Sequence, residues 1–269
     1  MVPDVIDRVA PTRRPTGERV VMRQTWADLL FLHWPVPPET LAPLLPPGLT
    51  LDTFEDGRAY VGLVPFTMTG VRPLWSPPVR GLSDFHETNV RTYVHYEGRD
   101  PGVWFFSLDA ANAIAVRIAR TLWKLPYHFA RMKIVHDGAR LCHETERLWP
   151  GPLPAACRVE YTPAGTPAPA EPGTLEHFLA ERYVLYARSR NGRLLRGQVH
   201  HAPYPLQTAT LHALDETLVA AAGITLPCPN EPPPLVHYAR AVSVEVFGLR
   251  EVRPSPSPPS PPLGGKGGL

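Results

Sequence analysis

The chain has 269 residues, of which 43% are hydrophobic, and 27 Lys plus Arg stand against 25 Asp plus Glu. This balance excludes the strong positive field that would hold nucleic acid or an anionic membrane, and no apolar run approaches the ~20 residues that span a bilayer. The N-terminus also lacks the apolar stretch of a secretory signal. We therefore expect a soluble, cytoplasmic protein without a nucleic-acid or membrane partner.

Proline is unusually abundant, with 35 in the chain, and it clusters at residues 163–173, 227–234 and 253–269. Because proline fixes its own φ angle and lacks the backbone donor of a sheet, these stretches are predicted to be loops or, at the C-terminus, a disordered tail. The predicted organisation is a flexible segment at 1–22, a single β-rich domain at 23–252 and a disordered tail at 253–269.

Strand-like runs bounded by turn residues dominate the domain. They fall at residues 24–34, 49–54, 58–69, 85–96, 102–109, 129–136, 140–148, 158–162, 183–189, 194–200 and 235–249. The Glu55-Asp56-Gly57 turn predicts one hairpin, and Asn191-Gly192 predicts another.

Helical patterns are fewer, at residues 38–45, 110–122, 174–182 and 211–222. Strands and helices do not alternate regularly, so the pattern does not favour a doubly wound sheet. The sequence predicts a mainly β fold of the α+β kind, an antiparallel barrel or sandwich with a few appended helices.

The strand at 85–96, FHETNVRTYVHY, carries most of the chemistry. Side chains alternate between the two faces of a strand, so one face carries a row of acid, amide, guanidinium, phenol and imidazole groups. That row is Glu87, Asn89, Arg91, Tyr93 and His95. It either faces water, as on many antiparallel strands, or lines an interior cavity that holds a ligand.

The helix at 110–122 has two stripes. Ala111, Ile114, Ile118 and Leu122 form an apolar one, and Arg117, Arg120 and Lys124 form a basic one. The basic stripe is either a solvated face or an anion site, since guanidinium groups bind carboxylates at two points.

The remaining cysteines and histidines give weaker evidence for a functional site. The cysteines Cys142, Cys157 and Cys228 lack the paired spacing of zinc or redox sites, and His200 and His201 face opposite ways on a strand, so no metal and no cofactor is predicted. His33 is interpreted as a packed histidine with one hydrogen bond.

Several long motifs resemble the YqjF-like bacterial family, domain of unknown function 2071. They lie at residues 29–68, 85–94, 102–120, 125–132 and 174–189, and the resemblance extends over about residues 23–250. That family is similar in fold to the acetoacetate decarboxylase superfamily, which implies a closed, cone-like antiparallel β-barrel around an internal pocket. Glu87 resembles the superfamily's pocket glutamate, which implies that the polar row points inward.

The resemblance also shows where this chain departs from the decarboxylases, whose motif ends in Pro-Lys-Lys with the first lysine forming a Schiff base. Arg120 matches the motif's Arg and Pro126 its Pro, whereas Tyr127 and His128 stand where the two lysines would be. A phenol and an imidazole cannot form an imine, so Schiff-base decarboxylation is predicted to be absent. Lys124 is a weak substitute, because nothing in the sequence shows a desolvated or cation-flanked setting.

Together these observations predict a pocket for a small organic ligand that carries a carbonyl or a carboxylate, with lysine-independent acid-base chemistry. Glu87 and His128 are the candidates for proton transfer and Tyr127 for hydrogen-bond donation. Arg91 and Arg120 are the candidates for an anion clamp, beside Asn89 and Tyr93.

Two alternatives stay open. One is a non-catalytic binding or sensor module, for which missing lysines are natural. The other is a scaffold that recruits partners through its proline-rich tail. The sequence also leaves a homo-oligomer open.

Overall fold

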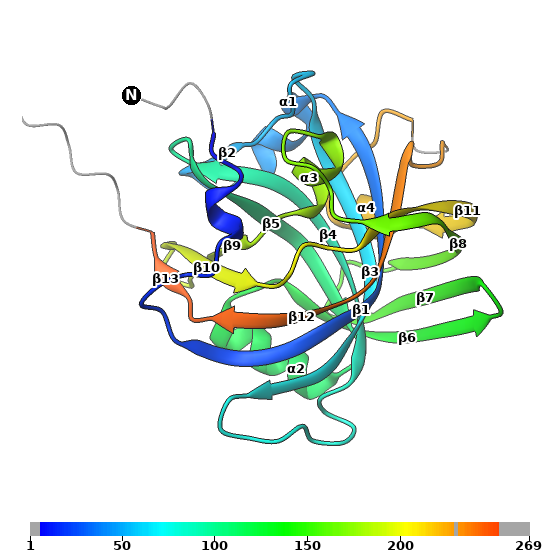
Figure 1. The fold of residues 1–269 in the computed structure, drawn as a ribbon, viewed down its shortest axis with the longest axis horizontal. Helices are drawn as coiled ribbons and strands as arrows, with labels where there is room; N and C mark the ends of the chain where they lie inside the picture. The colour runs from blue at the N-terminus through cyan, green and yellow to red at the C-terminus, as the bar shows by residue number, and fades with distance from the viewer. Residues whose placement is uncertain (1–5, 229–230, 253–269) are drawn as a thin grey trace, which may run out of the picture.

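The computed structural model describes residues 6–228 and 231–252, and strands dominate it (Figure 1). The strands are β1 (Val20–Val36), β2 (Leu49–Leu51), β3 (Ala59–Pro73), β4 (Phe85–Tyr96), β5 (Arg99–Ala110), β6 (Tyr127–Asp137), β7 (Arg140–Trp149), β8 (Ala156–Ala168), β9 (Val184–Arg188), β10 (Leu194–His200), β11 (Leu206–Glu216), β12 (Leu235–Phe247) and β13 (Arg250–Glu251). The helices are short: α1 (Pro38–Leu41), α2 (Ala113–Ile118), α3 (Leu175–Ala180) and α4 (Leu218–Ala221), with 3-10 turns at Ala10–Thr12 and Ala42–Leu44 and a π-helical turn at Ala119–Trp123. The predicted mainly β class is confirmed.

The described strands form one 13-stranded sheet that divides at β5 and β12. One edge of β12 pairs with β1, and its other edge pairs first with β11 and then with β10. Strand β5 likewise pairs with β4 on one edge and with β9 and β6 on the other. Since β4 also pairs with β3, the sheet closes into two rings that share β12, β1, β3, β4 and β5.

The larger ring is completed by β6, β7, β8 and β11, and the smaller ring by β9 and β10. The predicted ring closure is confirmed, with the correction that β5 pairs in parallel with both β6 and β9. Gly102 permits the contact between β5 and β9, because a Cβ atom there would lie 2.5 Å from the carbonyl oxygen of Val184.

Among the shared strands, β4 and the adjoining parts of β1 and β3 are buried on both faces. On one face, Val90 of β4 packs in a cluster with Val159 and Tyr161 of the larger ring. On the other face, Phe31 of β1 packs in a cluster with Tyr204, which follows β10. Because both faces of β4 are covered, its polar side chains lie in the interior on whichever face they stand.

Three sequence predictions are wrong. Strand β2 pairs with β4, not with β3, so there is no hairpin across Glu55-Asp56-Gly57. The helix predicted at 211–222 is largely strand β11, with only Leu218–Ala221 helical, and the loop predicted from residue 163 is strand as far as Ala168. Strands β8 and β11 pair along most of their lengths, and this tertiary pairing overrides local propensity.

Other predictions are confirmed. Strands β9 and β10 form the hairpin at Asn191-Gly192, where Gly192 has a φ of +84° in the left-handed region. The Thr174 hydroxyl caps α3 by accepting a hydrogen bond from the His177 backbone.

The part of the N-terminal segment that the structure describes lies against the domain, where Gln198 donates a hydrogen bond to the Pro11 carbonyl. The predicted tail at 253–269 lies outside the described residues. The boundaries at residues 22 and 252 stay predictions. Within the described residues, no helix combines the length and apolar character needed to cross a membrane.

Candidate functional site

The polar row of β4 is buried. Glu87, Asn89, Arg91, Tyr93 and His95 are exposed by 2%, 4%, 8%, 0% and 8%. The row therefore does not face water, and it lies on the side of β4 that faces the smaller ring, opposite Val90.

Glu87 forms the polar end of this row together with Tyr127, the first residue of β6. The Tyr127 hydroxyl donates a hydrogen bond of 2.7 Å to Oε2 of Glu87. Burial raises the pKa of Glu87 to about 8, although hydrogen bonds from Tyr127 and Asn89 lower it in part. Burial also raises the pKa of Tyr127 well above its usual value. At neutral pH both groups are therefore mainly protonated, and while the Tyr127 hydroxyl donates to Glu87, the protonated Glu87 carboxyl can itself donate a hydrogen bond to a carbonyl group.

Arg91 is a buried cation without a carboxylate. Its Nη2 donates to the Leu179 carbonyl at 3.1 Å, and its Nε has no hydrogen-bond partner among the described residues. No described acidic side chain forms an ion pair with it, and its guanidinium lies over the rings of Phe31 and Tyr93. Because an unpaired buried charge is costly, this position suits an anionic ligand.

Tyr93, with His33 beside it, connects the C-terminal part of α3 to the row. The Tyr93 hydroxyl donates to the Leu179 carbonyl at 2.8 Å and lies 2.6 Å from Nε2 of His33. Burial lowers the pKa of His33 well below its usual value, so the ring is neutral. The interpretation of His33 as a packed histidine with one hydrogen bond is confirmed.

An aromatic cluster that the sequence did not reveal completes the surroundings of the row. Ring contacts lead from Phe31 to Tyr204 at 5.4 Å, from Tyr204 to His201 at 4.5 Å, and from His201 to Trp26 at 5.7 Å. Trp26 then contacts Phe66, the register partner of Glu87. The contacts therefore run from Arg91 around to Glu87 through side chains of β1, β3 and the segment after β10.

Several polar atoms along this circuit are buried without a hydrogen-bond partner among the described residues. They are Nε1 of Trp26, Oδ1 of Asn89, Nε of Arg91 and Nε2 of His201. Buried polar atoms are rarely left unpaired in proteins, so these four atoms have hydrogen-bonding capacity that the described residues do not use. Sequence spacing gives no signal for this cluster, because its members come from distant strands that meet only when the smaller ring closes.

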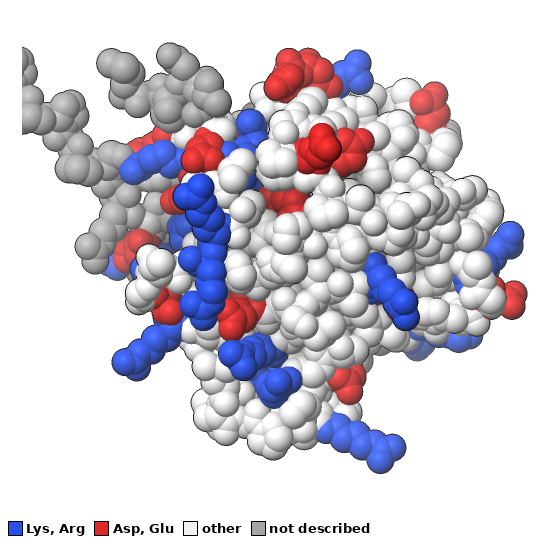
Figure 2. Space-filling view, viewed as in Figure 1, with Lys and Arg blue, Asp and Glu red and all other residues white. Residues whose placement is uncertain are grey.

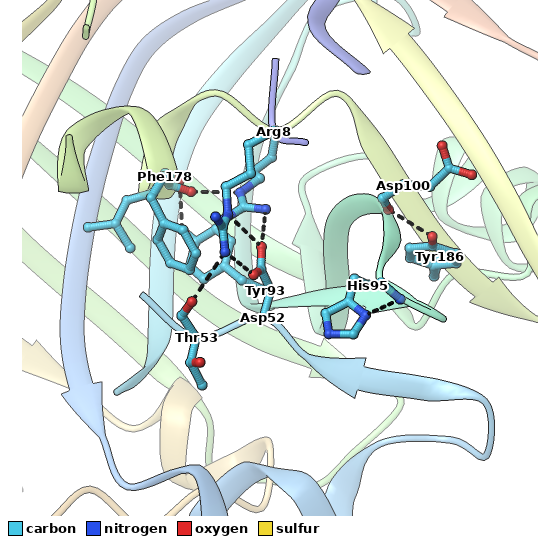
Figure 3. Close-up of polar contacts among 11 residues, drawn as sticks. Arg8, Asp52, Thr53, Tyr93, His95, Asp100, Phe178 and Tyr186 are labelled. Atoms are coloured by element: carbon cyan, nitrogen blue, oxygen red, sulfur yellow. Dashed lines mark hydrogen bonds and ion pairs between the residues drawn. The ribbon is translucent and has the colours of Figure 1, made fainter. Parts of the chain in front are cut away.

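A second charged cluster lies at the Tyr93 end of the row (Figure 3). Asp52 is fully buried and accepts hydrogen bonds from Arg8 at 2.5 Å and from Arg182 at 2.6 Å. Both guanidinium groups lie over the ring of Phe178. The Asp52 backbone also bonds the Tyr93 carbonyl, so this cluster holds the outer end of β4 in place.

Two predicted site residues lie away from the row. His128 follows Tyr127 on β6 and faces the other way, into the larger ring, where its Nδ1 lies 2.8 Å from the Pro150 carbonyl. Arg120 is exposed, and its guanidinium donates to the Tyr127 carbonyl and lies over Trp149. The structure thus brings Glu87, Tyr127, Asn89, Arg91 and Tyr93 to one region and separates His128 and Arg120 from it.

Two surface clefts, of about 620 and 370 Å³, are lined by the N-terminal segment and by residues near β10 and β13, and neither is lined by a residue of the row. Within the described residues, no group of three or more His, Cys, Asp or Glu side chains is placed to hold a metal ion.

The model of the DUF2071 family, described as an uncharacterized conserved protein, matches residues 23–243. The chain belongs to this family. Its sequence is 42% identical over 231 residues to the uncharacterized protein YqjF of Bacillus subtilis (strain 168), covering 86% of this chain and 92% of YqjF. The resemblance drawn from the motifs is therefore confirmed, and the polar row lies within the matched range.

Solved structures share the fold of this DUF2071 protein. The enduracididine biosynthesis enzyme MppR with HEPES bound superposes with a TM-score of 0.60 at 14% identity, covering 87% of this chain and 88% of that one. An acetoacetate decarboxylase from Legionella pneumophila superposes with a TM-score of 0.59 at 13% identity, covering 90% and 91%. At such identities these likenesses show the acetoacetate decarboxylase-like fold alone.

Proposed function

We propose that this protein binds a small organic anion between the β4 row and the aromatic cluster, with a carboxylate at Arg91 and a carbonyl group at Glu87 and Tyr127. The observation that carries the proposal is the buried Arg91, which within the described part of the chain has no counter-charge and keeps an unpartnered Nε. A carboxylate there would offset the cost of burying the guanidinium and would accept its free donor.

The aromatic cluster favours an organic ligand over an inorganic ion. Phe31, Trp26, Tyr204 and Phe66 offer apolar ring surface between the two polar ends of the row. Pockets for small molecules combine such surface with a few polar groups that fix orientation. Among the proteins of the same fold, MppR has been solved with HEPES and with the condensation product of pyruvate and imidazole 4-carboxaldehyde, which are small organic molecules bound by that protein.

The chemistry proposed for this site is acid-base chemistry without a lysine. Lys124 and Lys133, the lysines in the described part of the chain, lie on the outside, where the Lys124 amine donates to the Thr121 carbonyl at the end of the π-helical turn. Tyr127 takes the place next to Glu87, and a phenol forms no imine. His128, on the opposite face, is not part of this proposal.

Glu87 is suited to move a proton because its pKa of about 8 is close to physiological pH. Its ionised form would take a proton from the carbon beside the ligand's carbonyl, and the electron pair of that C–H bond would move onto the carbonyl oxygen to give an enolate. Once Glu87 is protonated, the Tyr127 hydroxyl is free to donate to the enolate oxygen. Return of the proton regenerates the ligand and the carboxylate.

Binding can be tested with Arg91→Gln. We expect the wild-type protein to show calorimetric binding and a thermal shift with some member of a panel of small 2-keto and 3-keto carboxylates, and none with the matching esters. Arg91→Gln should lose at least about tenfold in affinity, which corresponds to roughly 1.4 kcal/mol. It should not unfold the ligand-free protein, because it removes an unpaired buried charge.

Arg117→Gln is the matched control, since this arginine is exposed on α2, away from the row. The control should bind as the wild type does. Equal binding by wild type and Arg91→Gln, or a ligand-free Arg91→Gln protein that is several kcal/mol less stable, would contradict the proposed role of Arg91.

Proton transfer can be tested with a bound keto acid in deuterated buffer. We expect loss of the proton beside the carbonyl by NMR, with a rate that rises as pH passes through about 8, and a marked slowing in Tyr127→Phe. Binding without exchange would instead favour the alternative of a non-catalytic sensor module, for which the replaced lysine pair is natural.

A further inference from the structure

The apolar stripe of α2 and its π-helical continuation faces outward. Ile114, Ile118 and Leu122 are exposed by 55%, 47% and 66%, while Val116 is the fully buried residue of α2. Large apolar side chains at i, i+4 and i+8 normally mark the face that a helix packs against its core. Here that face has no cover within the described residues.

Two neighbouring segments extend this stripe. The Asn112 side chain caps α2 and also donates to the Leu82 carbonyl, which ties the helix to the β3–β4 loop carrying Leu74, Trp75 and Val79. Trp75 is 87% exposed, and Leu74 and Val79 are exposed by 51% and 49%. Figure 1 shows this loop and α2 together at the lower end of the view.

At the other end of the stripe, the Arg120 guanidinium lies 5.7 Å from the ring centroid of Trp149. Trp149, the last residue of β7, and Leu153, in the β7–β8 loop, are exposed by 54% and 56%. We call these eight residues the α2 patch: Leu74, Trp75, Val79, Ile114, Ile118, Leu122, Trp149 and Leu153. In Figure 2 the end of the molecule that carries the β3–β4 loop is mostly uncharged on the visible face, with basic side chains at its border.

We propose that the α2 patch is the contact surface with a second copy of this chain. Eight apolar side chains that are about half exposed or more amount to roughly 800 Å² per copy, which matches the area that each partner buries in a standard stable interface. The Asn112–Leu82 hydrogen bond and the Arg120–Trp149 contact join the segments that carry the patch, and monomeric proteins rarely leave so large an apolar area in water. Elsewhere on the described surface, exposed large apolar residues are scattered as Val9, Val21, Leu44 and Val135.

The composition of the patch also fits a self-association surface. Interfaces are enriched in Trp and Arg, and the patch contains Trp75 and Trp149, with Arg117 and Arg120 on the α2 segment beside them. A two-fold arrangement would place each patch against its equivalent, so no second surface is needed. Contact there would also bury Arg120, the residue that holds the Tyr127 carbonyl at the edge of the candidate site.

Sedimentation velocity of the full chain over the micromolar range tests the proposal. We expect the wild type to be a dimer, and Ile118→Glu and Leu122→Glu to be folded monomers or to associate at least about tenfold more weakly. Val135→Glu is the matched control, because Val135 is a partly exposed apolar residue on β6 outside the patch, and it should remain a dimer.

Circular dichroism and thermal denaturation of each variant show whether it folds, and since the replaced side chains are exposed, folding should be preserved. Trp75→Gln, on the loop rather than on the helix, should weaken association as well. A wild type that is monomeric at all concentrations overturns the proposal. This holds also if the monomer binds lipid vesicles through the α2 patch. So does a dimer that Ile118→Glu and Trp75→Gln both leave intact.

Discussion

The variant Glu87→Gln should be more stable than the wild type at alkaline pH, and the difference between them should grow with pH. Burial raises the pKa of Glu87 from 4.5 to about 8, so the native state keeps a proton that the unfolded chain has released. A raised acid pKa gives stability that is full below the unfolded value and is lost as pH rises through the folded value. Between about pH 5 and pH 9 the wild type should lose about 4 kcal/mol through this group.

The glutamine in Glu87→Gln keeps an oxygen that can accept the Tyr127 hydrogen bond but has no proton to release. Urea denaturation of both proteins at a series of pH values gives the difference curve, in which contributions common to both proteins, such as those of the buried histidines, cancel. Glu146→Gln, at an exposed carboxylate, is the control and should give a flat difference curve. A flat curve for Glu87→Gln as well would mean that Glu87 ionises normally, and the proton-transfer proposal would fail with it.

Asp52→Asn should destabilise the fold by about 3–5 kcal/mol, the typical cost of breaking a buried ion pair from one side. The Asp52 carboxylate is 0% exposed and lies between Arg8 and Arg182, and the Arg182 side chain is only 2% exposed. Burial lowers the pKa of Arg182, and Asp52 acts against that shift. Without the carboxylate, the buried Arg182 guanidinium would keep one described hydrogen bond, to the Phe178 carbonyl, and its contacts with the Tyr93 and Phe178 rings.

The control for Asp52→Asn is again Glu146→Gln, which breaks the exposed pair with Arg131 at 2.7 Å. Exposed pairs contribute less than about 1 kcal/mol, so this variant should be close to wild type. Chemical denaturation at neutral pH measures both. Equal effects of the two substitutions would mean that Asp52 is not what holds the outer end of β4, and that the guanidinium groups find other partners.

Strand positions were predictable where the local pattern was strong. The alternation in β4 and the Asn191-Gly192 turn gave the correct elements, because side-chain period and turn chemistry are local properties. The helix predicted from residue 211 covers the second half of β11, whose partners on β8 lie well before it in the chain, as with Glu216 and Cys157, so a local pattern could not show this pairing. The sequence shows the apolar stripe of α2, but it does not show that the stripe is exposed, because exposure depends on which elements pack against the helix.

The sequence by itself determined that Glu87, Asn89, Arg91 and Tyr93 share one face of a strand, and that Tyr127 and His128 replace the lysine pair. Only the tertiary structure decided that this face is buried and that Tyr127, not His128, reaches Glu87. Neighbours on a strand point in opposite directions, and the pairing of Tyr127 with Leu108 selects which of the two residues faces the smaller ring. Likewise, Trp26, His201 and Tyr204 meet beside the row only because β10 pairs with β12 and closes the smaller ring, a contact that no local pattern encodes.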